Sequence, residues 1–237
     1  MNAKASPNHD PNGADDARPV AAWGLVCALR EELGTLRRFE TRTLRRVGLD
    51  VHELDLDGVR LLACVGGVGK VCSAHAATVL LGEGATRGLL VVGVCGGLRQ
   101  NLSPGTLVHC TRAVQTDFAG RGERALEADP ELRSAWLSVA AGPAGWFLTA
   151  DRPVLSLWRR LRLARAFAGP CIADMETAAV ASVAASAGVR WAALRAVTDR
   201  ATVFGAASFK LHFPSQAGRC ADTVVPLLAA LARGSHG

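Results

Sequence analysis

The stretch from Ile172 to Ala201 constrains the fold more than any other part of the sequence. The small, alanine-rich segment from Thr177 to Ala187 predicts a helix, which Asp174 can cap and which Gly188 can end in a left-handed conformation. The segment from Val189 to Val197 follows, apolar except for two arginines, and is typical of a buried parallel strand. A helix followed directly by a buried strand indicates an α/β fold.

This arrangement places acidic side chains at one edge of the predicted sheet. Met175 and Glu176 stand at the start of the helix, and Asp199 follows the strand. Ligands of open α/β sheets bind in the crevice outside the carboxyl ends of the strands. Each acidic residue alone also has a purely structural interpretation, since such residues stabilise helix starts and favour turns. Their combination favours a site for acid chemistry on a polar small molecule.

A second acidic pair is expected at the same edge. The segment from Trp23 to Leu29 predicts the first strand, and it runs directly into R-E-E-L-G-T-L-R-R-F, which predicts the start of an amphipathic helix. Glu31 and Glu32 therefore lie at the carboxyl end of that strand. Two glutamates that open a helix are ordinary dipole-compensating residues when taken alone.

Further elements follow from apolar runs and their boundaries. Strands are predicted at 58–64, 88–94, from 103 onward and at 145–150, and helices from the glycine loop at 65–71 to about 81, at 155–167 and at 220–233. Residues 117–133 are predicted to form a polar, mobile connection, and 203–215 a loop or broken helix. The segment 1–20 is polar and is predicted to be a disordered tail, and it lacks the apolar region of a secretory signal.

Four motifs carry a family resemblance: D-M-E-T-A-A at 174–179, R-A-V-T-D at 195–199, G-G-V-G-K-V at 66–71 and A-L-R-E-E at 28–32. Together they resemble the purine nucleoside phosphorylase/uridine phosphorylase family, and most of all its 5′-methylthioadenosine/S-adenosylhomocysteine nucleosidase branch. The resemblance covers about residues 23–233. It implies an α/β, single-domain, three-layer fold over residues 21–237, in which helices flank a central, mostly parallel, mixed sheet. Members of the family are usually at least dimeric, so a homodimer is expected.

The resemblance also implies roles for particular residues. Asp199 matches the acid that protonates the departing purine, and Glu32 the base that activates the attacking water. Glu176 matches the carboxylate that binds the ribose hydroxyls, with Met175 packed beneath the sugar. The G-V-C-G-G turn, with Val94, Cys95 and Gly96, matches the turn along the ribose, and Pro153 and Val154 match the segment that covers the purine. Val94 stands where the family has serine, and Pro153 where it usually has an aromatic residue.

These assignments predict cleavage of the N-glycosidic bond of an adenine-containing, 5′-substituted ribonucleoside, with water or phosphate as co-substrate. Phosphorylases of the family bind phosphate through an arginine and a serine, whose places are Val91 and Val94 here. Burying a phosphate against valines is costly, so hydrolysis is predicted, although Arg30 and Lys70 are possible substitutes. Three alternatives stay open: a hopanoid-associated phosphorylase that releases adenine from adenosylhopane, a futalosine hydrolase-like enzyme, and a catalytically silent nucleoside-binding or storage protein.

Charge and cysteine content bear on the remaining function classes. The formal net charge of +6 could indicate nucleic-acid binding, but the arginines are dispersed and no aromatic-basic platform is present. The seven cysteines form no C-x-x-C pair, which argues against a zinc site and fits buried thiols in a reducing cytoplasm. No apolar run approaches the roughly 20 residues of a membrane span. No metal or cofactor is predicted.

Overall fold

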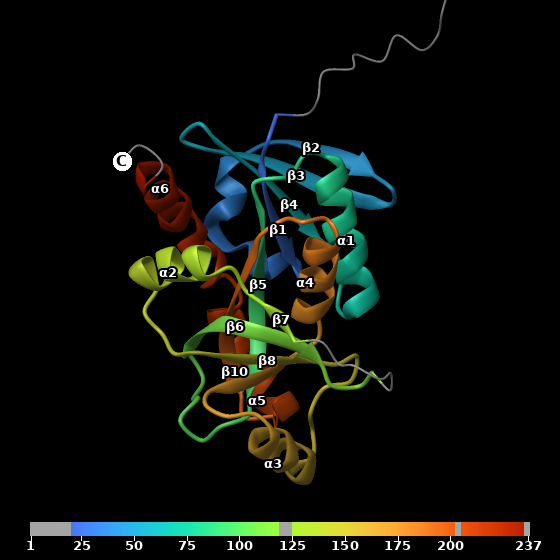
Figure 1. Cartoon of the computed structure of the whole chain (residues 1–237), viewed down its shortest axis with the longest axis vertical. Coiled ribbons are helices and arrows are strands. Elements are labelled where there is room, and N and C mark those ends of the chain that lie inside the picture. The colour runs from blue at the N-terminus through green and yellow to red at the C-terminus, as the bar shows by residue number, and fades with distance from the viewer. Residues whose placement is uncertain (1–19, 119–124, 202–204, 235–237) are drawn as a thin grey trace, which may run out of the picture.

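A computed structural model describes residues 20–118, 125–201 and 205–234 (Figure 1). The predicted tail 1–20 therefore lies outside the described residues, apart from Val20. In the part of the chain that is described, no helix has the length and apolar character that a membrane span requires.

One mixed sheet forms the centre of the molecule (Figure 1). Neighbouring strands in it follow the order β10-β6-β8-β9-β5-β1-β4-β3-β2, and β7 pairs with β6. Parallel pairings join β4, β1, β5 and β10, and also β6, β8 and β9. The bounds are β1 (Trp23–Cys27), β2 (Glu40–Arg46), β3 (Leu49–Leu56), β4 (Val59–Val65), β5 (Gly88–Gly97), β6 (Leu107–Gln115), β7 (Leu126–Glu127), β8 (Ala144–Thr149), β9 (Cys171–Asp174) and β10 (Trp191–Asp199).

Part of this sheet closes on itself. β5 pairs in parallel with β10 as well as with β1, and its last residues pair antiparallel with β9. β10 also pairs with β6, β6 with β8, and β8 with β9. The strands β5, β10, β6, β8 and β9 therefore form a closed ring, and β5 also belongs to the open half of the sheet. β5 and β10 are buried along nearly their whole length, as expected for central strands.

Helices cover both faces of the sheet, so the predicted three-layer, single-domain α/β architecture is confirmed. α1 (Lys70–Gly82) and α4 (Thr177–Ser186) lie side by side on one face, and their alanines pack into the core there (Figure 1). α2 (Pro130–Val139), α6 (Val224–Gly234) and the 3₁₀ segments Arg30–Phe39 and Ala221–Thr223 bury leucines and Trp136 against the other face. α3 (Leu157–Ala166) lies at one end of the molecule, and α5 (Gly205–Gln216) follows β10.

Several segments differ from the sequence prediction. The predicted amphipathic helix after β1 is a 3₁₀ segment with a kink at Gly34, whose φ of 51° and ψ of −134° are not helical. The connection predicted at 117–133 contains β7 and the start of α2, and Asp129 caps that helix by accepting a hydrogen bond from Leu132 N. The loop predicted at 203–215 is largely α5, with Pro214 inside it. The hairpin of β2 and β3 and the short β9 were not predicted.

Candidate active site

The carboxyl ends of β1, β5, β9 and β10 meet around one pocket of about 330 Å³. Every residue to which the resemblance assigned a catalytic or substrate-binding role lines it. These are Glu32, Val94, Cys95, Gly96, Pro153, Val154, Met175, Glu176 and Asp199. The strands therefore bring together residues that are up to 167 positions apart in the chain (32 to 199).

Glu32 is buried at the floor of the pocket, with 2% of its surface exposed. Its Oε2 accepts hydrogen bonds from Ala28 N (2.8 Å) and Leu29 N (3.0 Å), and its Oε1 accepts one from Val94 N (3.1 Å). Burial raises the pKa of this carboxyl, while Arg195 and the three backbone N–H groups act in the opposite direction. Glu32 is thus a rigidly held carboxylate with an increased affinity for a proton.

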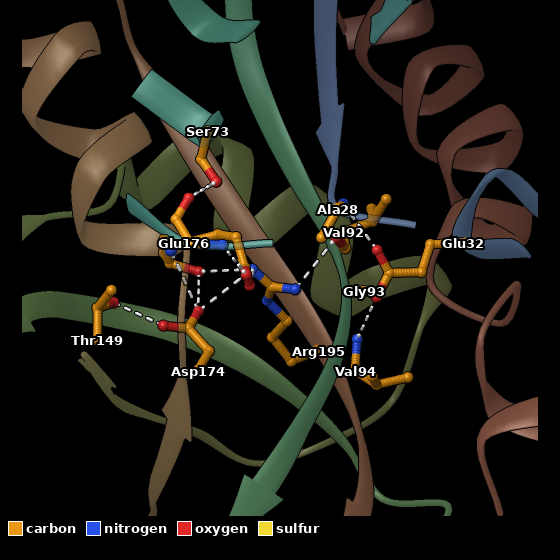
Figure 2. A network of polar contacts seen from close by, with 12 residues as sticks. Ala28, Glu32, Ser73, Val92, Gly93, Val94, Thr149, Asp174, Glu176 and Arg195 are labelled. Carbon is orange, nitrogen blue, oxygen red and sulfur yellow. Dashed lines mark hydrogen bonds and ion pairs between the residues drawn. The ribbon is translucent and has the colours of Figure 1, made fainter. Parts of the chain in front are cut away.

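Arg195 is the cation of the site, and it is fully buried on β10. Its Nη2 lies 3.1 Å from Glu176 Oε2 and 3.3 Å from Asp174 Oδ2, and its Nη1 donates to Val92 O at 3.3 Å (Figure 2). Although burial opposes the charge, the neighbouring carboxylates raise the pKa of the guanidinium. Arg195 therefore stays charged and fixes the two acidic side chains beside it.

Gly93 separates Glu32 from Arg195 (Figure 2). A Cβ atom at this position would lie 2.3 Å from Arg195 Nη1 and 2.6 Å from Glu32 Oε1, and φ is +145°. Only glycine lets the β5 backbone pass between the two charged groups.

Glu176 connects the ion pair to the glycine loop before α1. Besides its contact with Arg195, it accepts a hydrogen bond from Gly69 N through Oε1 at 3.0 Å. Burial raises its pKa, and Arg195 opposes that shift. Met175 is half-buried beside it in the pocket wall.

Asp174 holds the start of α4 in place. Its Oδ1 accepts a hydrogen bond from Thr149 Oγ1 at 2.6 Å, and its Oδ2 accepts from Thr177 N at 3.3 Å. Asp174 thus bonds the first residue of α4, whereas the N-cap position that the sequence prediction gave to Asp174 is occupied by Glu176, whose side chain makes no capping hydrogen bond.

Asp199 lines the pocket at the end of β10. The β5–β10 pairing shifts register between Val197 and Asp199, and this irregularity changes the direction of the backbone at the end of β10. Asp199 Oδ1 accepts a hydrogen bond from Ala201 N (2.6 Å), and Oδ2 accepts one from Thr198 Oγ1 (3.1 Å). Burial raises the pKa of this carboxyl against those two hydrogen bonds. A half-buried acid with a raised pKa is suited to donate a proton.

The positions considered for phosphate binding offer little to an oxyanion. Val91 is fully buried and is not among the residues that line the pocket, and the Val94 N–H already donates to Glu32. Lys70 Nζ pairs with Asp117 (2.7 Å) and Asp151 (3.4 Å), and neither Lys70 nor Arg30 lines the pocket. Arg152, which the sequence did not single out, lies exposed at its rim.

Sequence reasoning missed two parts of this site. In the sequence, Arg195 interrupts an apolar strand, and no role was predicted for it. A charge inside a buried strand requires a partner, and this requirement is the signal that identifies Arg195 as a candidate site residue. Asp174 was assigned to capping alone, whereas it also contacts Arg195. Among the described residues, no group of three or more His, Cys, Asp or Glu side chains is placed to hold a metal ion.

The chain is similar to known proteins in both sequence and structure. The family model described as the phosphorylase superfamily matches residues 23–231. The chain is 28% identical to a 5′-methylthioadenosine/S-adenosylhomocysteine nucleosidase of Mycobacterium bovis, over 88% of this chain and 97% of the relative. Its structure is similar to futalosine hydrolase of Helicobacter pylori (TM-score 0.83, 22% identity, 89% and 98% of the two chains). It is equally similar to the 5′-methylthioadenosine/S-adenosyl homocysteine nucleosidase of that organism (TM-score 0.83, 23% identity, 90% and 99%).

Proposed function

The chain belongs to the phosphorylase superfamily, and we propose that it hydrolyses the N-glycosidic bond of an adenine-containing, 5′-substituted ribonucleoside. The observation that carries the proposal is the convergence of Glu32, Glu176 and Asp199 on one pocket, each with its pKa raised by burial. The nucleosidase activity in the names of the curated relatives supports the same reaction class.

Asp199 is the general acid in this proposal. Cleavage of the C1′–N9 bond leaves negative charge on the purine, and protonation at N7 relieves it. The raised pKa keeps a larger share of Asp199 protonated near neutral pH, and the hydrogen bonds from Ala201 N and Thr198 Oγ1 fix the direction of its carboxyl. Pro153 and Val154, on the segment between β8 and α3, cover the purine from the side.

Glu176 binds the 2′- and 3′-hydroxyls of the ribose. Its carboxylate is already held by Gly69 N and Arg195, so it can accept from the hydroxyls without rearranging. Met175 packs beneath the sugar, and the turn with Val94, Cys95 and Gly96 borders it. The negative charge of Glu176 also stabilises the positive charge that develops on the sugar in the transition state.

Glu32 activates the attacking water. Three backbone N–H groups orient its carboxylate, and the raised pKa makes it a better base than an exposed glutamate. As the water attacks C1′, its proton passes to Glu32 and its oxygen forms the new bond to the sugar. The products are adenine and the free 5′-substituted ribose.

Hydrolysis is favoured over phosphorolysis by the charge of the pocket. Glu32, Asp174, Glu176 and Asp199 line it, whereas Arg195 is already paired with two of these carboxylates. A phosphate dianion beside Glu32 and Glu176 would lie against this excess of acid, because Arg152, the unpaired arginine of the lining, is at the exposed rim, and such burial costs several kcal/mol. A neutral water meets no such penalty.

The test is the reaction of a panel of adenosine derivatives with different 5′ groups, including an apolar lipid-like one, in phosphate and in phosphate-free buffer. Free adenine and the unphosphorylated sugar, at a rate independent of phosphate, are expected, with the Asp199→Asn variant as control for contaminating nucleosidases. A ribose 1-phosphate derivative formed in proportion to phosphate would replace hydrolysis by phosphorolysis. Binding of nucleosides without any purine release would identify a silent binding protein.

We further propose that the enzyme acts in the cytoplasm as a homodimer. The cysteines in the described part of the chain are unpaired, and all but Cys72 are buried, which suits a reducing compartment. Val68, Val71 and Phe118, which neighbour the ion-paired residues Lys70 and Asp117 in the sequence, are 48%, 82% and 56% exposed, and burial of such apolar side chains favours association with a second copy. Light scattering of the wild type and of Val71→Glu tests this, and a monomeric wild type contradicts it.

A further inference from the structure

The outward side of α3 combines apolar and basic residues. Leu157 and Trp158 are 52% and 81% exposed, and Leu155, just before the helix, is 47% exposed. One to two turns further, Arg162 and Arg165 are exposed on the same side, because residues i, i+1, i+4, i+5 and i+8 share a helix face. The inward side, with Leu163 and Ala164, packs on the core.

The charge of this region has one sign. Residues 152–173 contain five arginines and no aspartate or glutamate. Arg160 is turned inward and donates to Leu98 O at 3.0 Å. The other four, Arg152, Arg159, Arg162 and Arg165, have no carboxylate within ion-pair distance among the described residues.

The arginines of another exposed surface of the same chain are paired. On the edge strand β2, Arg42 pairs with Glu53, Arg45 with Asp50 and Arg46 with Glu83. Acidic partners neutralise that surface, whereas the α3 region is left with its full positive charge.

The region is also placed for contact with a large, flat partner. α3 lies at one end of the long axis of the molecule (Figure 1). Arg152 and Leu155 line the rim of the pocket, so the rim and α3 belong to the same end.

We propose that the α3 face, made of Leu155, Leu157, Trp158, Arg162 and Arg165, docks on the surface of an anionic lipid bilayer. Tryptophan and leucine insert at the boundary between headgroups and acyl chains, and arginines attract anionic headgroups. The helix presents both kinds of side chain on one solvent-facing side, with the tryptophan almost fully exposed in water. Docking would bring the pocket rim to the lipid surface.

Other occupants fit the α3 face less well. A second copy of the chain, paired about a two-fold axis, would set the arginines of one α3 face against those of the other, and this repulsion disfavours the pairing. A nucleic acid would use the arginines but would leave Trp158 and the leucines without an apolar environment. A bilayer satisfies both sets of residues.

The experiment is co-sedimentation of the full chain with vesicles of phosphatidylcholine alone and of phosphatidylcholine with phosphatidylglycerol in equal parts, at low and high salt. Binding to the anionic vesicles is expected, weakened by salt. Trp158 fluorescence should shift to the blue, and this is readable because Trp23, Trp136 and Trp191 are buried and Trp146 is half-buried. The measurement needs no substrate, so its result does not depend on the proposed nucleosidase activity.

Matched variants separate the two components. Arg162→Gln with Arg165→Gln should weaken binding about 25-fold, since each arginine at an anionic surface contributes about fivefold. Trp158→Ala should weaken it about tenfold or more. Arg37→Gln with Arg38→Gln on the 3₁₀ segment, and Leu211→Ala on α5 (Leu211 is 74% exposed), are the controls and should bind as the wild type does.

Three outcomes would overturn the proposal. The first is no binding to anionic vesicles, or equal loss in the α3 variants and the controls. The second is self-association without vesicles that Trp158→Ala abolishes, which would make the α3 face a protein interface. The third is binding to RNA that depends on Arg162 and Arg165 but not on Trp158, with no vesicle binding.

Discussion

Replacing Arg195 with methionine removes a cation that is buried among the acidic residues of the pocket. Arg195 Nη2 lies 3.1 Å from Glu176 and 3.3 Å from Asp174, and the exposed fractions of the three side chains are 1%, 7% and 0%. Breaking a buried ion pair by removing one partner costs about 3–5 kcal/mol. Because two carboxylates lose the same partner, we expect about 4–5 kcal/mol at about pH 8.

The size of this effect depends on pH, since an unpaired buried carboxylate can take up a proton. Protonating Glu176, whose ordinary pKa is 4.5, costs about 1.4 kcal/mol for each pH unit above that value. The destabilisation caused by an unpaired Glu176 carboxylate therefore has an upper limit of about 4.8 kcal/mol at about pH 8 and about 1.4 kcal/mol at about pH 5.5. Asp174 keeps its hydrogen bonds from Thr149 and Thr177 in the variant. The loss in Arg195→Met should therefore be about 3 kcal/mol smaller at the lower pH.

The sign follows from linkage. Burial already raises the pKa of Glu176, and removal of Arg195 raises it further. A group whose folded-state pKa is raised contributes its full stability below the unfolded-state value, here 4.5, and loses it as the pH rises through the folded-state value. The variant should thus become less stable relative to the wild type as the pH rises from about 5 to about 8.

The assay is urea unfolding followed by tryptophan fluorescence at the two pH values. Arg160→Met is the matched control, because Arg160 is also buried but bonds a backbone carbonyl and has no carboxylate at ion-pair distance in the described residues. Its loss of stability should be the same at both pH values. An Arg195→Met loss that is below about 1 kcal/mol, or that is independent of pH, would refute the reasoning.

Four further substitutions test the catalytic and positioning roles. Asp199→Asn should stay folded and bind ligand but lose about 100- to 10,000-fold in turnover, and near-normal turnover would remove Asp199 from the acid role. Glu176→Gln should weaken binding of the ribose in the transition state, and the wild type should cleave 2′-deoxynucleosides poorly. Equal rates for both sugars would mean that Glu176 does not contact the hydroxyls. Glu32→Gln should be nearly inactive in any buffer, whereas activity restored by phosphate would show that the nucleophile is not a water held by Glu32. Gly93→Ala should lose about 1–3 kcal/mol of stability, because its Cβ overlaps Arg195 and Glu32, and an unchanged unfolding midpoint would contradict this packing.

The acidic residues of the site could be predicted because chain order alone places them. Glu32 and Asp199 each follow an apolar run and Glu176 opens a helix, so an α/β fold delivers all three to one edge of its sheet. The sequence does not show what lies behind them. Arg195 is one charge in a strand, and its partners are defined only when β10 lies next to β5 and against the start of α4.

The unpredicted hairpin has a different cause. β2 lies at the edge of the sheet, and most of E-T-R-T-L-R-R is exposed, so the alternation of apolar and polar residues that marks a half-buried strand is lost. The turn between β2 and β3 uses Val47 and Gly48, both with positive φ, and valine is rare in that conformation. The ring closure is likewise invisible in sequence, because it depends on which strands pair and not on where strands occur.

That ring has a consequence for how the protein acquires activity as it is made. β10 closes the ring by pairing with β5. In this pairing Trp191 lies opposite Leu89, which is roughly a hundred residues earlier in the chain, so the contact forms later and more slowly than local structure. β10 carries both Arg195 and Asp199. Until it docks, Asp174 and Glu176 lack Arg195, the cation with which they pair, and the proton donor is missing. A nascent or truncated chain therefore passes through no partially active form: the last strand to join the ring completes the charge balance and the catalytic set in the same step.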